Sequence, residues 1–487
     1  MTRAILTAST MTPVVLAAAL GAVPAVAQDD PEVTAPQFRV VADWPKPLPN
    51  EWRVGQVAGV SVGPDDTIWI VQRPRSLSSS AAGATDAMAG VFVCNEGGPA
   101  MEEGAACAEG DDFGTAVPAD AFGNPRPHGP IADRGLPAPA VMQFDQEGNL
   151  LAAWGGPEQH DGANWHWPDP LWTNAEGVEC HWPAGEHAIS VDDEGMIYIA
   201  SNGRGDGSTS AAGNDRGWDG HILKFTPEGE CVMQIGAPLG DGSAAELADS
   251  NATDGGANGT PQLFRPANMN VHGDELFIAD GYGNRRIVVV DRNTGEYRRH
   301  WGAYGDVTVD DTIPGPFAAD RPAEQNPPAM FRTPVHCVRI AEDGLIYVCD
   351  RANNRIQVFD MTAGTDESCT DPSQEPENGC GFVMETFIRA DTLGPGSVWD
   401  LALSPDEAQS CLHQADGTNQ QVYTLHRPTL EILDAFGGSG RMAGLFHWIH
   451  DIAADSQGNL YTTEVDTGMR AQKFERVSGE ECAAPAN

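Results

Sequence analysis

Alternating apolar and polar residues recur along the chain in paired segments joined by turns rich in Asp and Gly. This period-2 alternation is typical of β-strands, and Asp/Gly turns connect antiparallel hairpins. Six copies of the strand–turn–strand unit begin at about residues 58, 187, 267, 336, 399 and 450. Clear copies include AISVDDEGMIYIASN and CVRIAEDGLIYVCDR, whereas the copy at 399, DLALSPDEAQSCLHQ, is degenerate.

Most pairs are followed by a third and a fourth predicted strand, as in HILKFTPEGECVMQIG and RRIVVVDRNTGEYRRHWG. Four antiparallel strands repeated six times indicate an all-β, six-bladed β-propeller. The last copy has only three strands, and QFRVVADW at 37–44 is a strand without a hairpin partner. We therefore predict that this N-terminal strand closes the sixth blade.

The predicted boundaries follow from this pattern. Residues 52–478 form the propeller, 28–51 the closing strand and its linker, and 479–487 a C-terminal tail. Insertions rich in Gly, Ala and acidic residues follow the second strands of blades one and two, at about 76–137 and 204–217. Loops of this length are commonly functional or disordered.

Residues 1–27 have the features of a cleaved signal peptide: Arg3, an apolar stretch ending near Val23, and the small residues AVA before Gln28. No later segment is long and apolar enough to span a bilayer. We expect a secreted or periplasmic protein, for which ten cysteines indicate disulfides. Cys94/Cys107 and Cys369/Cys380 are predicted local pairs, and the connectivity of the other six cysteines stays open.

The charge balance restricts the partners. The chain has 70 acidic and 28 basic residues, a net charge of −42, and such a surface repels nucleic acid and anionic lipid. We expect no nucleic-acid partner, a monomer, and a small-molecule or peptide-derived substrate if the protein is an enzyme.

Three histidines occupy the same position in alternate copies of the repeat. His187, His336 and His450 each lie 14 residues before the end of their strand pair, at Ser201, Asp350 and Glu464. The other three copies have Ala58, Ala267 and Trp399 at this position. Because the first strand of each blade lines the channel, we expect the three imidazoles to converge from directions about 120° apart. Three neutral imidazoles with an open fourth position suit a catalytic zinc ion.

Two further residues are predicted to lie on the same face, at the ends of second strands. Arg73 ends the first copy in IWIVQRPR, and Tyr282 follows the third in ADGYGNRRI. The arginine could bind a carboxylate through two donors, and the tyrosine could act as a general acid or base.

The repeat resembles NHL-type propellers in DGYGNRRIVVVD and DRANNRIQVFD. It more closely resembles peptidyl-α-hydroxyglycine α-amidating lyase, through GQVAGVSV, the Arg after the first strand pair, and HDIAADSQGNLY. The resemblance implies zinc at His187, His336 and His450, with Arg73 and Tyr282 in the active site. It also implies a structural calcium ion held by the Asp451 carboxylate and the backbone carbonyls of Val60 and Ile189, which is oxygen chemistry suited to that cation.

The reaction implied by the resemblance cleaves the N–C bond of a peptidyl α-hydroxyglycine to give an amide and glyoxylate. Arg73 would steer the glycine carboxylate or orient the catalytic hydroxide, and Tyr282 would be the base. Two other hypotheses remain open: a hydrolase such as a lactonase on the same scaffold, and a non-catalytic binding propeller whose channel metal is structural.

Overall fold

Six antiparallel sheets of four strands each form the framework of the part of the chain that the structure describes. The computed structural model describes residues 34–76, 138–156, 158–160, 164–166, 172–173, 177, 179–203, 218–239, 262–307, 329–370 and 380–483. All of them belong to one unit, Val33–Ala484. The predicted signal peptide, nearly all of the 76–137 insertion with Cys94 and Cys107, and the 204–217 insertion lie outside the described residues.

The blades follow one another along the chain, and each strand lies beside the next. Blade one contains β2 (Gln56–Val62), β3 (Ile68–Arg73), β4 (Val141–Phe144) and β5 (Leu150–Trp154). Blade two contains β10 (Glu186–Val191), β11 (Ile197–Ser201), β12 (His221–Phe225) and β13 (Cys231–Gly236). Blade three contains β14 (Asn268–His272), β15 (Glu275–Asp280), β16 (Arg286–Asp291) and β17 (Tyr297–Trp301).

Blade four contains β18 (Val335–Ile340), β19 (Ile346–Asp350), β20 (Arg355–Phe359) and β21 (Phe382–Phe387). Blade five contains β22 (Asp400–Leu403), β23 (Cys411–Asp416), β24 (Gln421–His426) and β25 (Glu431–Gly437). Blade six contains β26 (Ile449–Ala454), β27 (Leu460–Glu464), β28 (Arg470–Ser478) and β1 (Gln37–Val41).

Smaller elements lie between these strands. Two short hairpins, β6 (Glu158–His160) with β7 (Asn164–His166) and β8 (Trp172–Thr173) with β9 (Glu179–Cys180), lie between blades one and two in the chain. The short 3₁₀ helices are η1 (Pro49–Glu51), η2 (Pro74–Ser76), η4 (Ala303–Gly305) and η6 (Arg351–Asn353). No helix among the residues listed above as described is long and apolar enough to cross a membrane.

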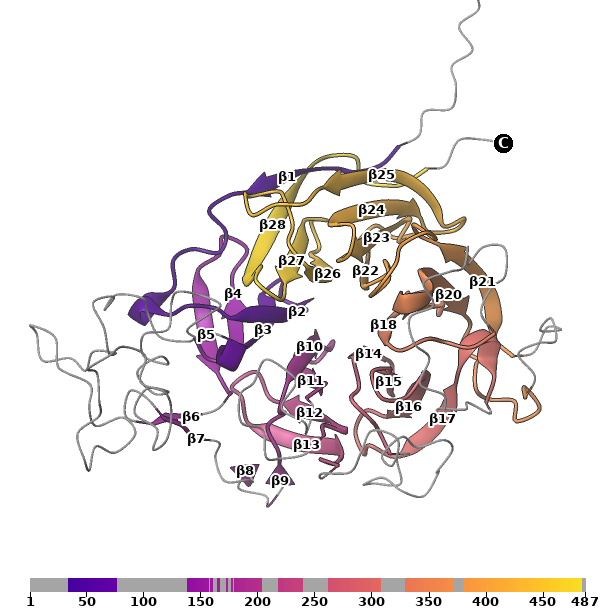
Figure 1. Ribbon diagram of the computed structural model, residues 1–487, viewed down its shortest axis with the longest axis horizontal. Helices are drawn as coiled ribbons and strands as arrows, with labels where there is room; N and C mark the ends of the chain where they lie inside the picture. Colours follow the sequence, from indigo (N-terminus) through magenta and orange to yellow (C-terminus); the bar gives the residue numbers. More distant parts are fainter. Residues whose placement is uncertain are drawn as a thin grey trace, which may run out of the picture. The chain divides into compact units, whose positions relative to one another are not determined.

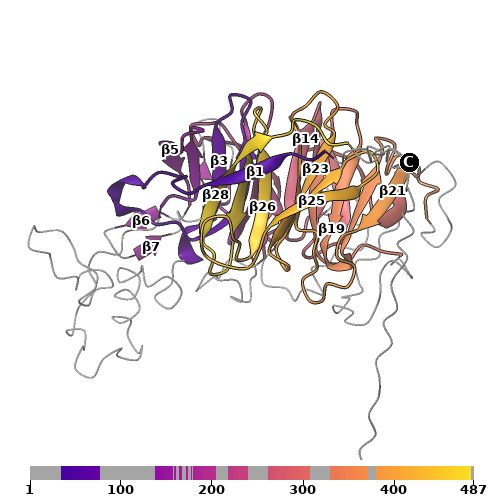
Figure 2. The same ribbon diagram turned by 90° about the horizontal axis from the view of Figure 1, so that it is seen from above.

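The sheets form a closed ring around a central axis, with the first strand of each blade innermost (Figure 1). These strands contact one another in cyclic order: β2, β10, β14, β18, β22, β26 and again β2. Seen from the side, the blades stand next to one another with their strands running from one face of the ring to the other (Figure 2). The predicted all-β, six-bladed propeller is therefore confirmed, including the degenerate fifth copy.

The hydrophobic core is divided into six clusters, each of which fills the space between two neighbouring blades. Between blades three and four, for example, Phe277 and Trp301 pack with Val348 and Phe359, and all four are fully buried. Each such side chain contributes roughly 1.5–3 kcal/mol through burial. The alternation along each strand thus supplies apolar side chains to both faces of a blade, and blade–blade packing holds the ring.

The two ends of the described part of the chain meet at blade six. β1 pairs with β28 from Gln37↔Ser478 to Val41↔Lys473, and it is shorter than the predicted 37–44 strand. Beyond β28, Ala483 bridges to Thr34 and Cys482 forms a disulfide with Cys411. The residues of the predicted tail up to 483 are therefore joined to the propeller.

Four disulfides lie in the described part of the chain. Cys369–Cys380 confirms the predicted local pair. The connectivity that the sequence left open is Cys180–Cys231, Cys337–Cys349 and Cys411–Cys482.

Candidate metal centre

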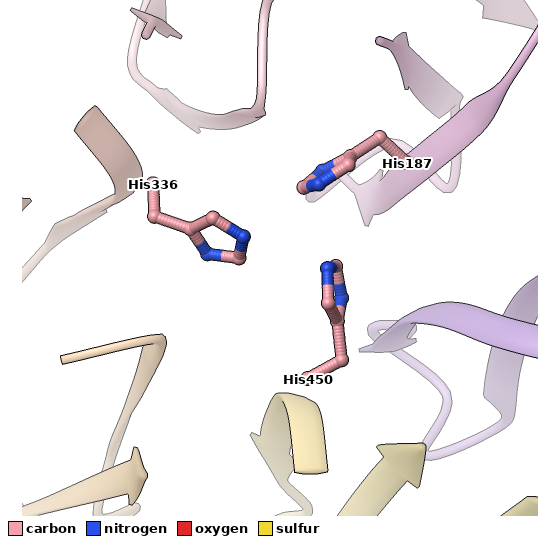
Figure 3. A group of neighbouring side chains, drawn as sticks. All are labelled: His187, His336 and His450. Atoms are coloured by element: carbon pink, nitrogen blue, oxygen red, sulfur yellow. The ribbon is translucent and has the colours of Figure 1, made fainter. Parts of the chain in front are cut away.

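His187, His336 and His450 meet at the axis of the ring, as their shared repeat position predicts. They come from β10, β18 and β26, the innermost strands of blades two, four and six. Their ring centroids are separated by 4.6–5.0 Å, and ligand nitrogens of all three lie within 4.8 Å of one another. Figure 3 shows the three imidazoles directed toward a common centre from three sides.

A local irregularity in each strand turns the histidine toward the axis. In blade six the pairing steps from Ile449↔Glu464 to Asp451↔Thr463, which leaves His450 as an extra residue in the first strand. The same shift skips His187 in blade two, and in blade four it skips His336 with its neighbour. Such β-bulges break the strict alternation of side chains and re-aim one of them. This explains how the consecutive residues His450 and Asp451 both contact groups in the channel.

The tautomer of each histidine is set by a neighbouring blade. The Nδ1 atoms of His187, His336 and His450 lie 2.6 Å from the carbonyl oxygens of Ala267, Trp399 and Ala58, respectively. A carbonyl oxygen only accepts, so each Nδ1 carries the hydrogen and each Nε2 presents a lone pair. The three acceptors are the residues that replace histidine in the odd-numbered copies, so all six blades contribute to the centre.

Electrostatics keeps the three imidazoles neutral. Burial is the largest cause that lowers the pKa of each histidine well below its usual value. Repulsion from the other imidazoles adds to this for His187, and Arg73 or Arg351 adds to it for all three. His336 Nε2 is buried and has no hydrogen-bond partner. Three convergent neutral imidazoles with Nδ1 bound to carbonyls are the donor set that zinc takes, so the residues fit that ion.

Tyr282 and Arg73 both lie beside the tripod. The Tyr282 hydroxyl is 3.0 Å from His187 Nε2, and because that nitrogen can only accept, the hydroxyl donates to it. Arg73 is held by hydrogen bonds from Nε to the Glu186 carbonyl (2.6 Å) and from Nη1 to Gln56 (2.8 Å). Burial lowers the pKa of Arg73, while Tyr282 and Glu186 partly offset that shift.

Two arginines that the sequence reasoning missed complete this face. Arg351 Nη1 donates to the Tyr282 hydroxyl at 3.1 Å, and its guanidinium stacks 4.2 Å from the Trp399 ring centroid. Arg265 lies 5.1 Å from the centroid of the Tyr282 ring. A signal for Arg351 was available, since it directly follows the second strand in IYVCDR, close to the position at which Arg73 ends that of IWIVQR. Arg265 lies before its first strand, where the repeat gives no comparable alignment.

Buried ion pairs hold the turns that carry Tyr282 and Arg351. In blade three, Arg286 Nε donates to Asp280 at 3.1 Å, and the other carboxylate oxygen accepts from the Phe264 backbone nitrogen. In blade four, Arg355 Nε donates to Asp350 at 2.7 Å. Each aspartate is the last residue of a second strand, so the ion pair fixes the start of the turn immediately before the functional side chain.

Below the tripod, Asp451 lies in a mixed polar cluster. Its carboxylate is 3.4 Å from Arg339 Nη2, and Asp400, which holds the same repeat position in blade five, is 2.7 Å from that nitrogen. Burial, and then the Asp400 carboxylate, raise the pKa of Asp451 well above its usual value, with Arg339 opposing. The donor set around Asp451 thus differs from an all-oxygen calcium cage, because a guanidinium occupies part of it.

The two predicted backbone ligands lie on neighbouring inner strands. Val60 is in β2 and Ile189 in β10, and the strands approach so closely that a Cβ on Gly59 would lie 2.8 Å from the Ile189 nitrogen. A second group of potential ligands, Cys337, Cys349 and Asp400, is not a metal site because its two sulfurs form a disulfide.

The fold and the histidine tripod define a six-bladed propeller with a candidate metal centre on its axis. Comparison with known proteins shows which families it is similar to. Residues 335–359, in blade four, match the NHL repeat. The chain is 26% identical over 294 residues to peptidyl-alpha-hydroxyglycine alpha-amidating lyase 1 of Drosophila melanogaster, covering 59% of the chain and 44% of that protein. It is 28% identical over 186 residues to peptidyl-glycine alpha-amidating monooxygenase B of Xenopus laevis, covering 38% and 17%.

The chain therefore shows a distant similarity to the amidating lyases, and the matches span less than half the length of either relative. Among solved structures, virginiamycin B lyase from Staphylococcus aureus aligns with 91% of this chain and 90% of its own, at 10% identity and a TM-score of 0.38.

Proposed function

We propose that the protein is an exported zinc-dependent carbon–nitrogen lyase that converts an α-hydroxyglycine amide into an amide and glyoxylate. The observation that carries the proposal is the convergence of three neutral histidines with the Tyr282 hydroxyl and the Arg351 guanidinium. The distant similarity to amidating lyases supports the reaction class, and the four disulfides support an oxidising compartment.

Zinc bound to Nε2 of His187, His336 and His450 would supply Lewis-acid chemistry at the substrate hydroxyl. In the overall reaction the hydroxyl O–H bond and the C–N bond break, a C=O bond forms, and the leaving nitrogen takes up one proton. Tyr282 Oη lies next to the tripod, and once its own proton has passed to solvent it would take the hydroxyl proton and return it to the leaving nitrogen. The Arg351 donor at this oxygen stabilises negative charge on it.

Two arginines beside the tripod favour a substrate that carries a carboxylate. Arg351 is buried and Arg73 is partly buried on the same face of the tripod, and burial lowers the pKa of each. A desolvated guanidinium binds a carboxylate strongly and through two donors. We propose that Arg73 and Arg351 hold the carboxylate that becomes part of glyoxylate and orient the carbinol carbon toward the tripod and Tyr282.

The direct test is glyoxylate release from α-hydroxyhippurate by the purified, zinc-loaded protein. We expect equal amounts of glyoxylate and benzamide, at a rate above the uncatalysed reaction in the same zinc-containing buffer. The His336→Ala variant, prepared in the same way, is the matched control and should release neither product above that background. If the zinc-loaded protein does not exceed the buffer rate, the lyase proposal is wrong, and the binding propeller becomes the better hypothesis.

A further inference from the structure

Arg339 reaches into the channel one layer below the histidine tripod. It belongs to β18, three residues after His336, and its side chain is 14% exposed. Its Nε donates to the Leu401 carbonyl at 3.0 Å, and Nη1 donates to Asn268 Oδ1 at 2.6 Å and to the Val338 carbonyl at 3.0 Å. Nη2 donates to Asp400 Oδ2 at 2.7 Å and lies 3.4 Å from Asp451 Oδ1. The five N–H groups of the guanidinium thus face five acceptors.

The acceptors come from four of the six blades. Asn268, Asp400 and Asp451 each follow directly the residue at the tripod position of blades three, five and six. The Arg339 guanidinium therefore joins the inner strands of blades three to six at a single level of the channel. A cation that bridges several first strands at this depth performs the role that a structural metal ion would have there.

We propose that Arg339 takes the place of the structural channel calcium that the resemblance implies at Asp451. Calcium requires six to eight oxygen ligands at about 2.3–2.6 Å, whereas a guanidinium already shares Asp451 Oδ1 with Ile452 N and repels a second cation nearby. The protein would then carry one metal ion per chain, the zinc of the tripod, and supply the second positive charge itself.

Two buried carboxylate oxygens near Arg339 are available to an added cation. Asp400 Oδ1 and Asp451 Oδ2 are buried without a hydrogen-bond partner. They are the atoms through which an added cation would bind if the Arg339 charge did not suffice. The test must therefore measure calcium binding to the native protein directly, and enzymatic activity is not needed as a readout.

The experiment uses the full protein stripped of metals and reloaded with zinc alone. Calcium is then titrated while heat of binding and thermal midpoint are recorded, and bound calcium is measured by elemental analysis after dialysis. We expect no stoichiometric calcium and no change in the midpoint of the native protein. One bound calcium per chain, or a midpoint that rises with calcium, would overturn the proposal whether or not the protein is a lyase.

Two variants test whether the guanidinium is the balancing cation. Arg339→Met keeps an unbranched apolar side chain but removes the guanidinium charge, so we expect a midpoint lower by about 3–5 °C in zinc-loaded, calcium-free protein. Arg339→Lys keeps a positive charge, so its thermal midpoint should fall less than that of Arg339→Met. If R339M is as stable as the native protein, the proposal is wrong. If R339M does not fold at all, the calcium titration of the native protein still decides.

Discussion

At the scale of single residues, one hydrogen bond determines what each histidine offers to the axis. The Nδ1 atom of His450 donates to the Ala58 carbonyl, which leaves Nε2 as the free ligand atom. Nδ1 of His187 and of His336 donates to a carbonyl in the same way, and Nε2 of His187 accepts from the Tyr282 hydroxyl. A carbonyl partner fixes both the ring orientation and the tautomer of a metal ligand. The alanines and tryptophan at the odd positions are therefore part of the centre through their backbone.

Removing one leg of the tripod should abolish zinc binding while the fold is retained. In His450→Ala we expect zinc affinity to fall more than about 100-fold, because two imidazoles remain where three are needed. His426→Ala is the matched control, since His426 lies on the third strand of blade five and its ring bonds the Thr429 hydroxyl, away from the tripod. Zinc content by elemental analysis and circular dichroism check both variants; a zinc content in H450A equal to that of H426A would contradict the assignment.

A substitution at Tyr282 can remove the hydroxyl and leave the aromatic ring in position. In Tyr282→Phe the ring would still lie between Arg265 and Arg351, but the oxygen that contacts His187 and Arg351 is lost. We expect kcat for glyoxylate release to fall by about 10²–10⁴-fold, with zinc content unchanged. Tyr423→Phe removes a hydroxyl that bonds Gln421, away from the tripod, and should keep full activity. Equal kcat values for the two variants would exclude Tyr282 as the proton-transfer group.

At the scale of elements, the turns after the second strands rely on buried charge pairs. Removing one partner leaves an uncompensated buried charge, which costs about 3–5 kcal/mol. We therefore expect Arg355→Met to lower the free energy of unfolding by that amount, because Asp350 stays fully buried without the guanidinium that pairs with it. The double variant Asp350→Asn/Arg355→Met should lose less free energy of unfolding than the sum of the losses in the two single variants. Denaturant unfolding of all four proteins completes the cycle, and strict additivity would show that the pair is not coupled.

His413 on β23 gives blade five a pH-dependent stability. Burial lowers the pKa of His413 to about 4, whereas an unfolded histidine titrates near 6.5. The unfolded chain therefore binds the proton first, so this contribution to stability is complete above pH 6.5 and is lost as the pH falls toward 4. The full loss is about 3 kcal/mol. In His413→Gln the unfolding free energy should fall less between pH 6.5 and 4 than in the native protein; parallel curves would contradict this.

The elements also show which features could be predicted from sequence. The strand pairs and the histidine register follow from local alternation and repeat spacing, so the propeller and the tripod were predictable. The bulges were not, because each lies at the first residues of its strand, where too few alternating positions precede it to reveal the shift. The Arg339–Asp400 contact joins residues 61 positions apart on different blades. Only the placement of the blades around the ring brings those two side chains together.

At the scale of the whole molecule, the charged side chains beside the tripod are opposite in sign to the net charge of the chain. The chain has a net charge of −42, yet Arg73, Arg265 and Arg351 gather beside the tripod. A local positive charge inside a strongly acidic protein concentrates anionic ligands at that point alone. This contrast supports a carboxylate-bearing substrate and argues against a purely structural role for the three arginines.

Closure of the ring depends on links between the last two blades as well as on β1. Cys411 in blade five is bonded to Cys482, which follows β28, across a separation of 71 residues, whereas Cys369–Cys380 spans 11 residues. In the chain-entropy account the longer loop stabilises the folded state by about 4 kcal/mol and the shorter by about 3 kcal/mol.

We therefore expect Cys411→Ala/Cys482→Ala to lower the free energy of unfolding more than Cys369→Ala/Cys380→Ala. The first pair also connects the chain end to another blade, so its removal should free the Thr34–Ala483 bridge that lies beside Cys482. Hydrogen exchange of residues 34–41 and 470–483 should rise in the first variant only, because β1 and β28 form the seam where the ring closes. Equal exchange in both variants would mean that β1 pairing and blade packing alone keep the ring closed.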